Sequence, residues 1–194
     1  MLIGLMGKSG SGKTEISLLF KEKCSRISVL DVDKIGHNAY QDTNVRANVI
    51  KHFGRSVINK EGKVDRKKIA DIVFSDKAMM QKLYEITYGY MEKRIDEYIS
   101  QNEIVLLDYA LLPLTKYYDM CDVKILVTSE YSVRLNRAIK RDKISPEKYI
   151  KRDLNSVNYE EMFFDYVIEN NDNIETLRKV VGDIYEKSII PWEF

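Results

Sequence analysis

The chain is poor in the residues that mark several classes of protein. Its two cysteines, Cys24 and Cys121, are far apart and lack the paired spacing of a zinc site, so we expect reduced thiols. Its three prolines form no proline-rich linker, and we find no internal repeat or low-complexity tract. These absences exclude a disulfide scaffold and a repeat array, and we predict a single domain over 1–194.

Charge and hydropathy exclude two further classes. The formal net charge is +1, so no global positive field favours nucleic acid as a partner. No apolar stretch is long enough to span a membrane, and the first residues lack the basic region of a signal peptide. We therefore expect a cytoplasmic protein with neither a nucleic-acid nor a membrane partner. The sequence indicates no oligomeric state.

Short apolar runs alternate with longer amphipathic stretches, which is typical of an α/β fold with a mostly parallel sheet. We predict three layers, α/β/α, around a sheet of about five strands. The strand candidates are 2–6, 27–30, 104–107, 123–127 and 167–168. Helical spacing is found over 34–53, 66–101 (one short and one long helix), 131–142 and 146–154, and from Ile174 onward.

Two stretches are predicted to form separate parts of the domain. The segment between the second and third strand candidates is too long for one crossover, so we predict an inserted helical lobe over 55–101 that binds the acceptor substrate. Within it, Met79, Leu83, Ile86 and Tyr90 form a stripe that we expect to be buried. The two helices after the fourth strand are predicted to form a helical lid region over 131–156.

A glycine-rich motif supplies the strongest functional signal. It matches G-x-x-x-x-G-K-[ST] in full and lies between an apolar strand and a helical pattern. Glycines let backbone N–H groups turn toward phosphate oxygens, and the helix that follows directs its positive end there. The motif predicts a P-loop that binds ATP and Mg²⁺; a chance match in a flexible loop is the alternative. The predicted nucleotide-binding residues are Gly7, Ser9, Gly10, Ser11, Gly12, Lys13 and Thr14.

Within this motif, two side chains have separate tasks. Lys13 is expected to reach the β- and γ-phosphates as a cation, and the Thr14 hydroxyl to ligate Mg²⁺.

Carboxylates follow two strand candidates. Asp31 and Asp33 would lie on one side of a continuing strand, where they could supply a catalytic base and support Mg²⁺. Alternatively, one of them caps the next helix. Asp108 ends the third strand candidate, where it either supports magnesium or is a buried hydrogen-bonding residue. His37 and His52 have no cysteine or second histidine nearby in sequence, which favours packing or surface roles.

Basic residues gather after the fourth strand candidate. Arg134, Arg137 and Arg141 are spaced so that one helical face carries all three guanidinium groups. Such a face is either a solvated charged surface or a lid whose arginines bind the phosphates of ATP. Because the chain begins with a phosphate loop, we favour the lid.

Taken in order, these motifs resemble the dephospho-CoA kinase family over almost the whole chain. The resemblance rests on GKSGSGKT, LDVDKIGH, FGRSVINKEGKVDRKKIADIVF, VLLDYALLPL, RLNRAIKRD and FDYVIENN. It departs at Tyr88-Gly89, where the family has His-Pro, at Ala110, where it has proline, at Ser156, where it has glutamine, and at Glu15, where it has a second hydroxyl. These departures concern the acceptor site more than phosphoryl transfer.

The resemblance implies an enzyme that moves the γ-phosphoryl group of ATP to the 3′-hydroxyl of dephospho-CoA. It implies that Asp33 is the base, that Arg137 and Arg141 act from the lid, and that Asn170 lies near the adenine. The implied acceptor-binding residues are Asp33, His37, Arg66, Tyr88 and Asp108, and the candidate metal ligands are Thr14, Asp31 and Asp108. The alternatives are a kinase of the same fold with another hydroxyl acceptor and a non-catalytic nucleotide-binding module.

Overall fold

The computed structural model describes residues 1–73, 76–171 and 173–192. They form two compact units, which we call the sheet unit (Met1–Leu30 with Ile99–Phe194) and the helical unit (Asp31–Tyr98). The predicted lobe over 55–101 overlaps the helical unit, which also contains 31–54. Phe74, which ends the third of the family motifs, lies outside the described residues.

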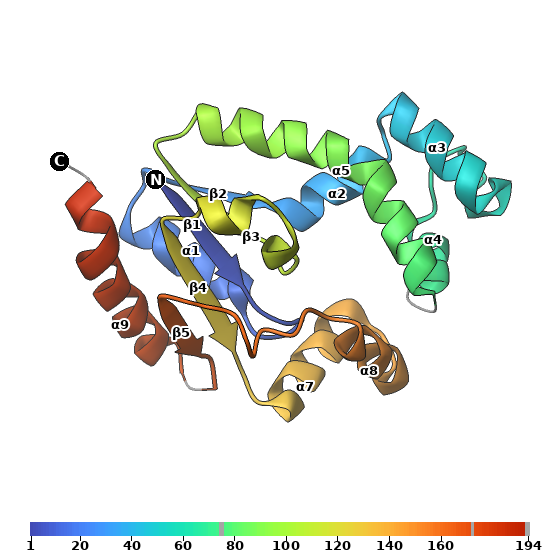
Figure 1. Cartoon of the computed structure of the whole chain (residues 1–194). Coiled ribbons are helices and arrows are strands. Elements are labelled where there is room, and N and C mark those ends of the chain that lie inside the picture. The colour runs from blue at the N-terminus through green and yellow to red at the C-terminus, as the bar shows by residue number, and fades with distance from the viewer. Residues whose placement is uncertain (74–75, 172, 193–194) are drawn as a thin grey trace. The chain divides into compact units, whose positions relative to one another are not determined.

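The sheet has five strands in the order β2-β3-β1-β4-β5 (Figure 1). Strand β1 pairs in parallel with β3 and with β4, and β4 pairs in parallel with β5. Every residue of β1 and β3 is buried, which explains their continuous apolar sequence. The predicted α/β class with a parallel sheet of five strands is therefore confirmed. The strands are β1 Leu2–Met6, β2 Ile27–Asp31, β3 Ile104–Asp108, β4 Val123–Thr128 and β5 Tyr166–Glu169.

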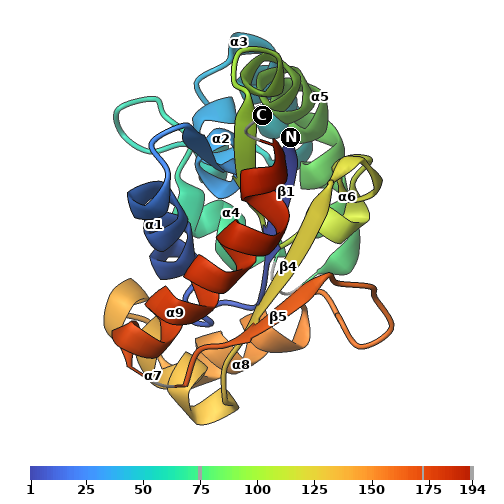
Figure 2. The same cartoon turned by 90° about the vertical axis from the view of Figure 1, so that its left-hand side faces the viewer.

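The core of the sheet unit joins the sheet to two helices, α1 (Lys13–Lys23) and α9 (Ile174–Ile184), which contact each other and lie on the same side of β1 and β4 (Figure 2). Phe20 from α1 and Val181 from α9 are buried in one cluster with Ile3 and Ile125 of the sheet. The chain continues beyond α9 through short helical turns, and the remaining short elements are η1 Arg55–Val57, η2 Leu112–Leu114, α6 Tyr117–Met120, η3 Tyr185–Ile189 and η4 Ile190–Trp192.

Helices α7 (Tyr131–Asp142) and α8 (Pro146–Leu154) have the predicted bounds, and local sequence explains the break between them. Lys143 ends α7 with a left-handed backbone, φ 52°. Ser145 then accepts a hydrogen bond from the Lys148 N–H, and Pro146 fits the first helical turn, where no N–H is needed.

The helical pattern over 34–53 is divided between two helices, α2 (Val32–Ala39) and α3 (Thr43–Phe53). The Asp42 carboxylate accepts hydrogen bonds from the N–H groups of Asn44 and Val45 at 2.9 and 3.0 Å, and so begins a new helix. The apolar spacing runs through the break because both helices bury residues in the same cluster, whose members include Ala39 and Val49.

The remaining helices of this unit are α4 (Arg66–Val73) and α5 (Lys77–Ser100), a short and a long helix as predicted. The predicted stripe packs against the buried cluster of the helical unit, although its side chains are only partly buried: Met79, Leu83, Ile86 and Tyr90. Within the described ranges, no helix combines the length and apolar character that crossing a bilayer requires.

Gly89 lies exposed inside α5, and a Cβ atom added there would meet no atom within 4 Å. We expect Gly89→Ala to raise the free energy of unfolding by about 1 kcal/mol, because alanine has less backbone freedom to lose in a helix. Thermal unfolding followed by circular dichroism measures this as a higher midpoint.

Gly54→Ala is the matched control, because Gly54 has φ 80° and an added side chain would be strained there. We expect that variant to unfold at a lower temperature. A lower midpoint for Gly89→Ala would contradict the expectation.

Candidate functional site

The phosphate loop connects β1 to α1 through glycines in the left-handed region. Gly10 and Gly12 have φ 85° and 98°. A Cβ on Gly10 would lie 2.3 Å from the Arg134 carbonyl oxygen, and one on Gly12 would lie 1.9 Å from Asn170 Nδ2. Both positions therefore require glycine for backbone conformation and for close approach.

Helix α1 begins directly after this loop with Gly12 as its N-cap, and no side chain caps it. The first N–H groups of a helix have no partner inside the helix, and they carry the positive end of its dipole. Since the carboxyl ends of parallel strands meet at this edge of the sheet, the arrangement forms an anion site of the kind that binds phosphate.

Lys13 and Asp108 form an ion pair beside the loop. Lys13 Nζ donates to the Gly7 carbonyl at 3.2 Å and lies 3.7 Å from Asp108 Oδ1. Asp108 ends β3, which pairs with β1 so that Leu5 and Asp108 are in register. Both side chains are nearly buried, at 13% and 11% exposure, so each charge depends on the other or on a bound ligand. The strand end thus brings Asp108 to the loop, as its place in the sequence suggested.

A cavity of about 670 Å³ opens over the loop. Its volume suits a nucleotide-sized ligand. Five cationic side chains and one carboxylate line it, which favours an anionic ligand. The lining residues are Lys8, Gly10, Gly12, Lys13, Thr14, Glu15, Arg137, Lys140, Arg141, Asn170, Ile174 and Leu177.

Asn170 supports the loop from the end of β5. Its side-chain Nδ2 donates to the Ser11 carbonyl at 2.8 Å, and its backbone carbonyl oxygen accepts from Arg137 Nη1 at 3.0 Å. The side chain is buried and lines the cavity, so the predicted place near the nucleotide is compatible with these contacts.

The predicted arginine face of α7 divides into two kinds of residue. Arg137 and Arg141 line the cavity, but Arg134 does not. Arg134 is 9% exposed, and its Nη1 donates to the hydroxyl of Tyr149 and to the carboxylate of Asp153, both on α8. The prediction that all three arginines share a ligand-facing surface is therefore wrong, since Arg134 binds the neighbouring helix.

Asp142 orients the guanidinium groups of Arg141 and Arg152. Its carboxylate accepts from Arg141 and from Arg152, and these hydrogen bonds hold its pKa down at about 2, although burial opposes the shift. Both guanidinium groups also donate to the Ser9 hydroxyl, at 3.2 and 3.4 Å. Asp142, Tyr149, Arg152 and Asp153 were not among the predicted site residues, because only the fold brings them to the loop.

The other predicted residues lie in the helical unit. Asp31 caps α2 by accepting from the Lys34 N–H at 3.1 Å, and the strand ends there, so the two aspartates do not alternate along a strand as one interpretation required. The capping interpretation is confirmed for Asp31. Asp33 lies in the first turn of α2.

Tyr88 of α5 packs against Tyr84 with ring centroids 4.9 Å apart.

His37 and Arg66, both predicted to bind the acceptor, contact each other. Arg66 Nη2 lies 3.0 Å from His37 Nε2. Because guanidinium only donates, Nε2 must accept, which requires a neutral imidazole. Burial and then Arg66 lower the pKa of His37, while Asp33 and Asp31 oppose the shift.

This lowered pKa makes stability depend on pH. Below about pH 6.5, the ordinary histidine pKa, the unfolded chain binds more protons than the folded chain, so stability is lost as pH falls toward the lower folded pKa. We expect the wild type to lose more thermal stability between neutral and mildly acidic pH than His37→Gln does. Differential scanning calorimetry across this range measures the difference.

His52→Gln serves as the control, because His52 is exposed on α3. Its pH profile should follow that of the wild type. Identical profiles for the wild type and His37→Gln would contradict the expectation.

The fold and the loop define the class of protein. A parallel sheet whose first strand leads through G-x-x-x-x-G-K-[ST] into a helix is the P-loop nucleotide-binding fold. Shikimate kinase from Acinetobacter baumannii shares this fold, with a TM-score of 0.53 and 18% identity over 95% of this chain and 90% of that chain.

Within this class, the chain belongs to the dephospho-CoA kinase family, whose model matches residues 1–176. It is 37% identical to a dephospho-CoA kinase of Aquifex aeolicus over 95% of this chain and 96% of that protein. It is 38% identical to one of Fusobacterium nucleatum over 93% and 95% of the two chains. The crystal structure of TT1252 from Thermus thermophilus matches with a TM-score of 0.81 and 25% identity, covering 96% of this chain and 97% of that chain. The family resemblance found in the sequence is confirmed.

Proposed function

We propose that this chain transfers the γ-phosphoryl group of ATP to the 3′-hydroxyl of dephospho-CoA, the last step of coenzyme A synthesis. One observation carries the proposal: the basic cavity over the phosphate loop occurs in a chain that matches dephospho-CoA kinases along almost its full length. A cytoplasmic location remains a prediction from the sequence.

In this function, the sheet unit binds ATP. The N–H groups at the start of α1 and the side chains of Lys13, Arg137 and Arg141 bind phosphate oxygens in the cavity. Ile174 and Leu177 supply apolar surface in the same cavity, which suits a nucleotide base. The charge that develops on the transferred phosphoryl group is stabilised by cations already held in place.

The residues beside the loop fit a magnesium ion. Thr14 lines the cavity at the start of α1, and Asp108 offers a carboxylate beside Lys13. Among the described residues, no group of three or more histidine, cysteine, aspartate or glutamate side chains could hold a metal. Mg²⁺ suits such a site, because it is often bound by one or two protein oxygens together with substrate phosphates. When bound, Mg²⁺ would neutralise phosphate charge, and Thr14 and Asp108 would hold it. Asp31 stays a candidate ligand from the sequence alone.

The family motifs assign five residues to the acceptor side of the reaction, and Asp108 is one of them. Asp33 orients the ribose hydroxyl and accepts its proton, the role of a general base. The paired His37 and Arg66 bind the acceptor, and the guanidinium of Arg66 suits its phosphate groups. Tyr88 is the fifth residue assigned to the acceptor. These roles are carried over from the family motifs.

A single assay tests the proposal. Purified protein is incubated with ATP, Mg²⁺ and dephospho-CoA, ADP release is followed with coupling enzymes, and the product is identified by mass spectrometry. Formation of CoA is expected, with no product when Mg²⁺ is chelated. ATP turnover without CoA would transfer the search to other hydroxyl acceptors, and absence of both would favour a nucleotide-binding module.

A further inference from the structure

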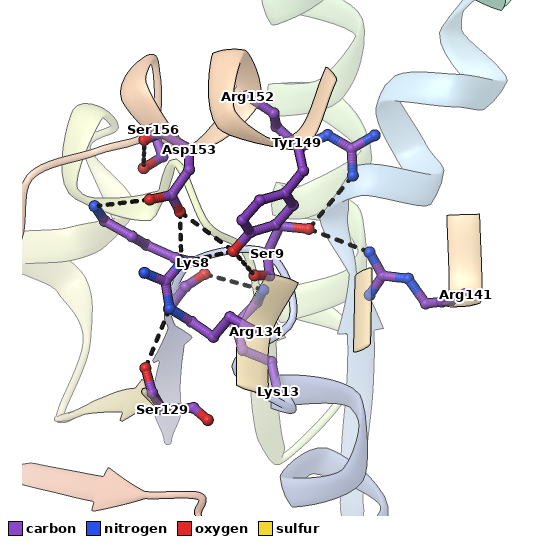
Figure 3. A network of polar contacts seen from close by, with 11 residues as sticks. Lys8, Ser9, Lys13, Ser129, Arg134, Arg141, Tyr149, Arg152, Asp153 and Ser156 are labelled. Carbon is purple, nitrogen blue, oxygen red and sulfur yellow. Dashed lines mark hydrogen bonds and ion pairs between the residues drawn. The ribbon is translucent and has the colours of Figure 1, made fainter. Parts of the chain in front are cut away.

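Helices α7 and α8 contact three consecutive residues of the phosphate loop, of which Figure 3 labels Lys8 and Ser9. Lys8 Nζ lies 3.9 Å from Asp153 Oδ2. The hydroxyl of Tyr149 donates to the Ser9 carbonyl at 3.1 Å. Gly10 packs so closely on the Arg134 backbone that a Cβ atom would overlap its carbonyl oxygen. The loop is therefore held from this side by its backbone as well as by side chains.

Asp153 lies at the centre of these contacts. Its Oδ1 accepts from Arg134 Nη1 at 2.5 Å, and the Tyr149 hydroxyl is 3.5 Å from the same oxygen. The side chains of Arg134 and Asp153 are only 11% and 14% exposed. A guanidinium group this buried needs a carboxylate partner, so Asp153 fixes the position of Arg134.

Tyr149 transmits this arrangement to the loop. Its side chain is fully buried, and burial raises its pKa to about 12, so the hydroxyl keeps its proton. Arg134 Nη1 donates to the hydroxyl oxygen at 2.8 Å, which leaves the single hydroxyl proton to donate. Of its two acceptors, the Ser9 carbonyl at 3.1 Å lies nearer than Asp153 Oδ1 at 3.5 Å. Neither Tyr149 nor Asp153 lines the cavity, so their contacts act on the loop and not on a ligand.

We propose that Asp153 is a positioning residue for the nucleotide phosphates: it fixes Arg134 and Tyr149, which hold residues 8–10 in the conformation that binds them. The physical reason is preorganisation. Loop N–H groups bind phosphate strongly only if they already point at it, and reorienting peptide groups on binding would reduce the affinity. Lys8, which lines the cavity, is held by the same carboxylate. The inference rests on the nucleotide half of the proposed function and does not depend on the acceptor.

The test measures the Kd for a non-hydrolysable ATP analogue by calorimetry, together with KM and kcat for ATP and the unfolding midpoint. Asp153→Asn is expected to raise Kd and KM for ATP by roughly 10- to 100-fold while kcat at saturating ATP stays within about threefold. Tyr149→Phe keeps the buried ring and removes one hydrogen bond, so it is expected to raise Kd by roughly 3- to 10-fold. Asp153→Glu is expected to restore part of the affinity.

The control is Asp165→Asn. The Asp165 carboxylate accepts from the Lys124 N–H at 2.7 Å, at the start of β4 and so at the opposite end of that strand from the loop. This variant is expected to lower the unfolding midpoint and leave the Kd for the analogue unchanged. If Asp153→Asn folds poorly, Tyr149→Phe carries the test.

Two outcomes separate this inference from the proposed function. A lowered midpoint with unchanged Kd and KM in both Tyr149→Phe and Asp153→Asn would overturn the inference and assign these residues to stability alone. Weaker binding of the analogue in the variants, in a protein that makes no CoA, would uphold the inference and refute the assigned acceptor.

Discussion

Replacing Lys13 with alanine is expected to lower kcat/KM for ATP by roughly 10³- to 10⁴-fold and to weaken ATP binding. The loss of one preorganised charge partner in the transition state costs about 10²- to 10³-fold. A second effect adds to it, because Asp108 lies 3.7 Å from Lys13 Nζ and is nearly buried. Without the lysine, its carboxylate would repel the incoming phosphates. Steady-state kinetics and calorimetry with a non-hydrolysable analogue measure both effects.

Two further variants make this expectation specific. Lys140 also lines the cavity but is exposed on α7, so Lys140→Ala is expected to lower kcat/KM by less than about tenfold. In the Lys13→Ala background and with Mg²⁺ chelated, Asp108→Asn is expected to recover part of the affinity for the ATP analogue, because it removes the repelling charge. Wild-type affinity and rate in Lys13→Ala would refute the assignment of the phosphate loop.

The phosphate loop could be predicted from the sequence because its requirements are local. Three glycines, a lysine and a threonine lie within eight residues of each other, and the apolar strand and the helix adjoin them directly. The break between α7 and α8 was predictable for the same reason, since Ser145 and Pro146 begin a helix by their own chemistry. Asp108 needed one further step, the rule that parallel strands end at one edge.

The orientation of Arg134 could not be predicted in this way. Helical spacing shows which residues share a face of α7, but not which neighbour that face meets. Arg134 turns toward α8 because Tyr149 and Asp153, 15 and 19 residues further along the chain, bind its guanidinium. The contact between Tyr149 and Ser9 spans 140 residues. Contacts at such separations depend on tertiary structure, and one sequence carries no local signal for them.

Asp31, which ends β2, and Asp33, in the first turn of α2, show the same limit on a smaller scale. A strand that continued would have placed Asp31 and Asp33 on one side, and a helix start would separate their roles. The sequence allowed both interpretations. The structure ends the strand at Asp31, whose carboxylate accepts from the Lys34 N–H and also pairs with Lys34 Nζ at 3.0 Å. This separation makes the two carboxylates distinguishable by mutation.

Asp31→Asn is therefore the control for Asp33→Asn, which is expected to have a large effect on turnover. Asparagine also caps helices well, so this variant should keep α2 and leave kcat close to that of the wild type. If Asp31 supports the metal ion, the Mg²⁺ concentration needed for half-maximal rate will rise in this variant while Asp33 keeps its role.

Asp33→Asn is expected to lower kcat by roughly 10²- to 10⁴-fold while the Kd for the ATP analogue stays within a few-fold, because a general base acts on the acceptor hydroxyl and not on the nucleotide. The substitution preserves shape and removes only the ability to accept the proton. The acidic limb of the kcat–pH profile, which a titrating base produces, should also disappear from the residual activity. Single-turnover measurements with saturating dephospho-CoA separate the chemical step from product release. Near-normal turnover in Asp33→Asn would remove Asp33 from the role of base, and a parallel loss of ATP affinity would assign it to the nucleotide site instead.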